Sequence, residues 1–118
     1  MELFNYRKSY TKHKLSINDI GDNPIDFFMK WFKEAENSGQ ISEPNAMTIS
    51  TVDENSFPSS RVVLLKQIKE RSLIFFTNYN SNKGKSLEKN ENICASFYWP
   101  PLERQVIIKG KAKKLPSV

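Results

Sequence analysis

The predicted central strand of this chain, residues 58–66, ends in Arg61-Val62-Val63-Leu64-Leu65-Lys66, where four aliphatic residues stand between two cations. An unbroken aliphatic run is typical of a strand that is buried on both faces. Charges buried at its ends would then need partners, and a phosphate group could bind both of them. Alternatively, the two long side chains could extend from the strand ends into water, and composition alone favours this second interpretation.

Outward from this run, the sequence predicts short antiparallel strands. Met47, Ile49 and Thr51 alternate on one face of a preceding strand that begins at residue 46. A polar turn at 53–56 joins it to the central strand as a hairpin, and Asn55 is expected to take the left-handed conformation there. Three further strands are predicted, at 72–77, 93–99 and 105–113. This pattern indicates a mostly β fold, an antiparallel barrel or sandwich with flanking helices.

One amphipathic helix is predicted ahead of the strands. Asn23 and Pro24 have the form of an N-cap followed by proline in the first turn, and Gly39 ends the helix. Aromatic and small residues recur between them at helical spacing and are predicted to pack into the core: Phe28, Trp31, Phe32 and Ala35. Residues 1–22 lack such periodicity, so we interpret them as an arm and residues 23–118 as the domain.

The net charge of +5 at pH 7 favours an anionic partner. Lys109, Lys111 and Lys113 alternate along the last predicted strand, which is typical of a solvated sheet edge. The lone Cys94 excludes an intramolecular disulfide and is expected to be a buried, inert thiol, and no apolar run reaches the length of a membrane span. We therefore expect a cytoplasmic protein without a membrane partner. The one histidine, His13, is far from Cys94 in the sequence, so no residue set is expected for a metal site, and a Ser/His/Asp mechanism has little support.

Several motifs follow one another in an order that resembles a known family. They are Glu43-Pro44-Asn45-Ala46-Met47, Thr51-Val52-Asp53, Pro58-Ser59-Ser60 leading into 61–66, Phe75-Phe76-Thr77-Asn78-Tyr79, Ser81, Lys83-Gly84, Phe97, Trp99 and Leu102-Glu103-Arg104-Gln105-Val106. This succession, together with Arg7 and Tyr10 near the amino terminus, is similar to the pyridoxamine 5'-phosphate oxidase family. The match runs from about Arg7 to Gly110, nearly the whole chain.

The resemblance implies an FMN-binding split barrel with Greek-key-like antiparallel strands that acts as a homodimer. It implies an oxidase of vitamin B6 metabolism, which converts pyridoxamine or pyridoxine 5'-phosphate to pyridoxal 5'-phosphate with dioxygen. The FMN-binding residues that it implies are Arg61, Val62, Val63, Leu64, Leu65, Lys66, Phe76, Thr77, Lys83 and Gln105. The substrate-binding residues that it implies are Arg7, Tyr10 and Lys66. It implies no catalytic residue and no metal ion.

Three points qualify the expected site. In a regular strand Arg61 and Lys66 point to opposite faces, so a bulge, a bend or contact with two parts of the flavin is predicted. Asn82 stands where the family commonly has arginine, which weakens one expected contact. The family also continues beyond Val118, so a flavin-binding module without B6 oxidase activity is an alternative. A nucleic-acid-binding barrel is suggested by charge alone, and the aromatic residues fall mostly at core positions.

Overall fold

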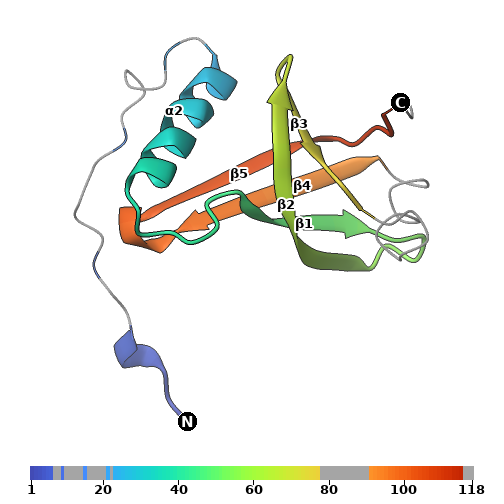
Figure 1. Cartoon of the computed structure of the whole chain (residues 1–118). Coiled ribbons are helices and arrows are strands. Elements are labelled where there is room, and N and C mark those ends of the chain that lie inside the picture. Colours follow the sequence, from blue (N-terminus) through green and yellow to red (C-terminus); the bar gives the residue numbers. More distant parts are fainter. Residues whose placement is uncertain (7–8, 10–14, 16–20, 22, 78–90, 116–118) are drawn as a thin grey trace.

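The computed structural model describes residues 1–6, 9, 15, 21, 23–77 and 91–115, and in them a curled antiparallel sheet carries one α-helix at its end (Figure 1). The strands are β1 (Ala46–Val52), β2 (Pro58–Lys69), β3 (Ser72–Phe75), β4 (Asn92–Trp99) and β5 (Arg104–Lys111). The helix is α2 (Pro24–Asn37), and two short 3-10 turns are η1 (Phe4–Tyr6) and η2 (Pro100–Leu102). The predicted mostly β class is confirmed.

The strand order β3-β2-β1-β4-β5 gives the sheet its Greek-key form. Hairpins join β1 to β2 and β2 to β3, and β4 then returns to pair with β1 on its free side. That arrangement of four strands is the Greek-key pattern that the resemblance implied. The last strand, β5, pairs only with β4 among the described residues, and its exposed Lys109 and Lys111 lie along the edge as predicted.

The sheet curls because β2 belongs to both of its halves. Residues 58–64 of β2 pair with β1, whereas residues 65–69 pair with β3. The register shifts once, between Leu65 and Gln67, where a β-bulge leaves Lys66 without a partner on β3. A bulge increases local twist and bends its strand. Figure 1 shows the result, with the β2–β3 hairpin standing across β1, β4 and β5 to form half of a barrel.

Helix α2 begins and ends where the sequence predicts. The side-chain oxygen of Asn23 accepts a hydrogen bond from the main-chain N–H of Ile25 at 2.9 Å, and Pro24 occupies the first turn. Gly39 takes a φ of +65° just beyond the C-cap, a conformation that glycine adopts without steric strain. The apolar stripe of α2 packs into the core as expected, with Phe28 and Ala35 buried.

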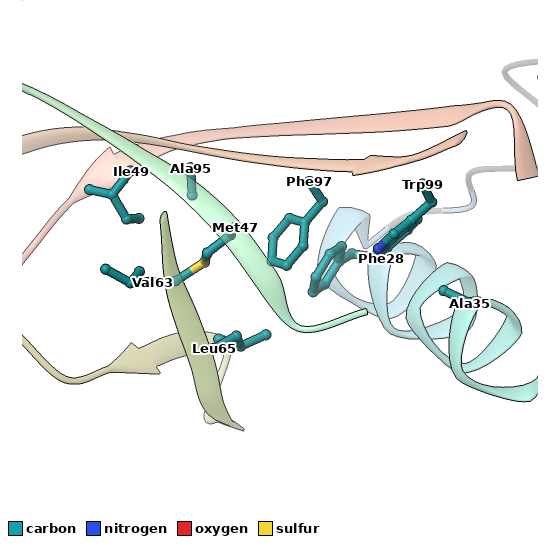
Figure 2. Packing of buried hydrophobic residues seen from close by; sticks show 9 residues of the cluster. All are labelled: Phe28, Ala35, Met47, Ile49, Val63, Leu65, Ala95, Phe97 and Trp99. Atoms are coloured by element: carbon teal, nitrogen blue, oxygen red, sulfur yellow. The ribbon is translucent and has the colours of Figure 1, made fainter. Parts of the chain in front are cut away.

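The core lies between this helix and the concave face of the sheet (Figure 2). The ring of Phe28 points from the helix toward Phe97 and Trp99, with ring centroids 5.1 and 6.3 Å away. Met47 and Val63 continue this apolar layer along β1 and β2. Phe97 and Trp99 are 0% and 1% exposed, so the core-facing side chains at the end of β4 lie deep in the core.

Some local predictions differ from the structure. Ser56, not Asn55, has the left-handed conformation in the first hairpin, with a φ of 62°. The reason is that Asp53 Oδ1 accepts hydrogen bonds from the N–H groups of both Asn55 and Phe57, so the reversal falls on the residue between them. Cys94 is half-buried, because its side chain lies on the convex face in register with Ser50.

Candidate functional site on strand β2

The segment Arg61–Lys66 is buried on one face only, so the prediction of a strand buried on both faces is wrong. Val63 and Leu65 point into the core and are 8% and 5% exposed. Val62, on the opposite face, is 64% exposed, and Leu64 is half-buried. Among the described residues, no second layer covers this convex face, so the aliphatic run serves a core on one side and an open surface on the other.

The strand is bulged at Lys66, the second of the two cations. Leu65 and Ile68 both pack toward the core, whereas Lys66 and Gln67 between them are exposed. The extra residue therefore changes the alternation of faces at this point of the strand. Lys66 thus leaves the regular pleat, which is one of the outcomes predicted from the sequence.

Arg61 lies at the other end of the segment, in register with Ile49 of β1. Its side chain is exposed although it falls on the core-facing side of the pleat, where its partner Ile49 is buried. Within the described part of the chain, no ion pair involves Arg61 or Lys66. Both cations are therefore accessible to an anion, as charge-assisted binding of a phosphate requires.

Phe76 and Thr77 follow β3 directly and lie near the same part of β2, because Phe75 pairs with Leu65. The phenyl ring of Phe76 is 73% exposed. The hydroxyl oxygen of Thr77 is buried, and in the described structure it has no hydrogen-bond partner. A buried polar atom without a partner is rare in folded proteins and is consistent with a bonding group supplied by a ligand.

Gln105 lies on the exposed convex face of β5 and pairs with Tyr98. The register places it three strand spacings from Leu64, roughly 14 Å along the sheet. Its neighbour Arg104 is fixed from the opposite face, where Nη1 donates to Glu34 Oε2 at 2.9 Å and the guanidinium lies 4.4 Å from the centre of the Trp31 ring. Sequence patterns gave no sign of this contact between α2 and β5.

Six of the ten predicted cofactor residues lie on β2, where Arg61, Val63 and Leu65 fall on the core-facing side, whereas Gln105 lies on β5. Val62, Leu64 and Gln105 share the convex face, Lys66 leaves the pleat at the bulge, and Phe76 with Thr77 adjoins β2. The predicted contacts Arg7, Tyr10 and Lys83 lie outside the described residues, as do Asn82 and Ser81. In the described ranges, no group of acidic, histidine and cysteine side chains could hold a metal ion, and no helix has the length and apolarity of a membrane span.

Comparison with known proteins identifies the family. The family model of pyridoxamine 5'-phosphate oxidase matches residues 34–118. The chain belongs to this family. Proteins described as pyridoxine/pyridoxamine 5'-phosphate oxidase from Flavobacterium johnsoniae and Haemophilus influenzae are 53% and 52% identical to it over 117 residues. Each alignment covers 99% of this chain and 55% of the relative, so the chain spans about half the length of these proteins.

Two solved structures share the fold of this chain. PhzG from Burkholderia lata, in complex with tetrahydrophenazine-1-carboxylic acid, superposes with a TM-score of 0.79 at 29% identity, covering 84% of this chain and 48% of PhzG. An FMN-binding protein related to pyridoxamine 5'-phosphate oxidase from Nostoc punctiforme gives 0.66 at 18% identity, covering 78% and 48%. These similarities confirm the split-barrel fold that the sequence predicts.

Proposed function

We propose that this chain binds FMN along β2 and forms the flavin-binding part of an oxidase that converts pyridoxamine or pyridoxine 5'-phosphate to pyridoxal 5'-phosphate. The observation that carries the proposal is the buried hydroxyl of Thr77, which lacks a partner in the described structure beside a strand with two accessible cations. Family membership and the FMN-binding relative of the same fold support it. The residues present therefore fit an elongated, phosphorylated ligand.

Each polar residue of the proposed site has a chemical role. Arg61 and Lys83 would donate charge-assisted hydrogen bonds to the FMN phosphate, and Thr77 a neutral one to the ligand. Gln105 would donate to a carbonyl of the flavin ring. Lys66 would contact FMN and the substrate phosphate, while Arg7 and Tyr10 would bind the substrate. The bound flavin supplies the redox chemistry, in which two electrons pass from the substrate carbon to dioxygen.

We also propose that the domain, residues 23–118, acts as a cytoplasmic homodimer in pyridoxal phosphate biosynthesis. Support for a dimer comes from the convex face of the sheet, where Val62, Tyr98 and Ile107 are 64%, 57% and 53% exposed. Val62 pairs with Thr48, Thr48 with Ser96 and Ser96 with Ile107, so Val62 and Ile107 lie in one row across the sheet. Exposed apolar surface of this kind marks an interaction site, and FMN bound at this face would lie at the subunit interface.

A second candidate function is flavin binding without B6 oxidase activity. PhzG, a protein of the same fold, was solved with a tetrahydrophenazine ligand rather than a B6 compound. Both candidates place FMN on β2, and they differ only in the reaction.

Sequential addition of cofactor and substrate separates the two. The purified chain is titrated with FMN, and pyridoxamine 5'-phosphate is then added in air while pyridoxal 5'-phosphate and hydrogen peroxide are measured. Saturable FMN binding followed by equal amounts of both products supports the oxidase. Binding without product selects the flavin-binding module. Absence of FMN binding, in a chain shown to be folded by circular dichroism, contradicts both.

A further inference from the structure

The residue that precedes β1, Asn45, clamps β2 at Leu65. Its main-chain oxygen accepts a hydrogen bond from the N–H of Leu65 at 2.8 Å, and its side-chain Nδ2 donates to the Leu65 oxygen at 2.9 Å. In a longer antiparallel pair the main chain would make both bonds. Here the chain turns at residues 43–46, where the N–H of Ala46 donates to the Glu43 oxygen, so the amide side chain replaces the missing main-chain donor.

This clamp acts directly next to the bulge. The residue that it holds, Leu65, is the last to pair in register before Lys66, and Ile68 beyond the bulge packs against the core. Lys66 is therefore fixed on both sides, although it has no partner on β3. Without the Asn45 side chain, the Leu65 oxygen would lose its bond and the start of the bulge would be free to shift.

The clamp is itself anchored in the core. The indole N–H of Trp99, a residue that is 1% exposed, donates to the main-chain oxygen of Pro44 at 3.0 Å. Trp99 packs in turn against Phe28 and Phe97. A continuous set of contacts thus runs from the buried aromatic cluster through Pro44 and Asn45 to Leu65.

We infer that Asn45 is a positioning residue that aims Lys66 at the phosphorylated ligand. The inference rests on the proposed function, since it takes Lys66 to be a ligand contact. Asn45 itself lies one strand away from Lys66 and acts through the main chain of Leu65. Side chains that cannot donate a hydrogen bond at this position are expected to weaken ligand binding by misplacing the lysine.

A double-mutant cycle on FMN affinity tests this inference, with Asn45→Ala and Lys66→Met made singly and together. Asn45→Ala should raise the Kd for FMN about fivefold, the effect of one lost hydrogen bond. In the Lys66→Met background, the same change should alter Kd by less than about twofold, because the group that it positions is gone. A role in stability alone would not produce this dependence on residue 66.

Matched variants complete the test. Ser50→Ala removes the 2.8 Å hydrogen bond between Ser50 and Ser60, which joins the same two strands far from the bulge, and should leave Kd within about twofold. Asn45→Leu keeps a side chain of similar size without the donor and adds no charge, and it replaces the alanine variant if that does not fold. If Asn45→Ala raises the Kd for FMN equally in both backgrounds, or does not change it in the wild type, the inference is wrong but the proposed function is not affected. Failure of the wild type to bind FMN overturns the proposed function with it.

Discussion

Replacing Thr77 by valine should move protein stability and cofactor affinity in opposite directions. The Thr77 hydroxyl is buried and has no partner in the described structure. Burial of an unpaired hydroxyl costs about 1–3 kcal/mol, and valine has the same shape without the polar atom. The variant without FMN should therefore be more stable by about 1–2 kcal/mol. For a domain of this size, that raises Tm by roughly 4–8 °C.

The same substitution should weaken FMN binding. If the ligand completes the hydrogen bonding of Thr77, valine loses a bond worth about 0.5–1.5 kcal/mol, which is about a 2- to 10-fold rise in Kd. Thermal unfolding of the FMN-free protein and fluorescence titration with FMN measure the two effects on the same preparation. Thr77→Ser is the control, because it keeps the hydroxyl and should bind FMN within about twofold of the wild type.

Two results would refute this reasoning. A loss of stability in the FMN-free valine variant would mean that the hydroxyl has a bonding partner within the protein. An unchanged Kd for FMN would mean that the ligand does not reach Thr77. Either result removes the observation on which the proposed function mainly depends.

Three further predictions concern the strand, its turn and the core. Arg61→Ala should raise the Kd for FMN about 10- to 100-fold, as expected for a lost charge-assisted bond, with little change in the Tm of the FMN-free protein, whereas Lys69→Ala on the same strand should not change Kd. Glu70 and Arg71 form a two-residue hairpin turn with φ of 51° and 65°, a conformation that strains residues with a side chain. Changing the pair to Asn-Gly should therefore raise the free energy of unfolding in urea by about 1 kcal/mol, and a lower free energy would contradict this strain. Phe97→Ala should destabilise by about 3–5 kcal/mol, and a loss under 1 kcal/mol would contradict its place in the core.

Features of this fold that depend on residues close together in the sequence could be predicted from the sequence. Alternating polarity located β1, and the Asn23–Pro24 cap located the start of α2, because these signals are local. A bulge was one of three expected outcomes, beside a bend or contact with two parts of the flavin, because the pleat aims Arg61 and Lys66 at opposite faces.

What the sequence could not predict depends on contacts between distant residues. The ion pair of Arg104 with Glu34 spans 70 positions, and nothing local to either residue distinguishes it from a solvated charge. Asn45 belongs to a motif of the family, yet its bond to Leu65 appears only once β1 and β2 are paired. The burial of β2 on one face only was missed because an aliphatic run has the same sequence pattern whether its second face is buried in a core or exposed as an apolar surface.

Binding of FMN along β2 is tested most directly by assigned amide NMR spectra of the chain recorded during a titration with FMN. Saturable shifts are expected mainly at residues 61–66, at Thr77 and at Gln105, with little change at Lys30 and Lys33 on the helix. Arg61→Ala should require a higher FMN concentration for the same shifts. Shifts confined to the helix, or spread over all exposed lysines without saturation, would contradict binding along β2.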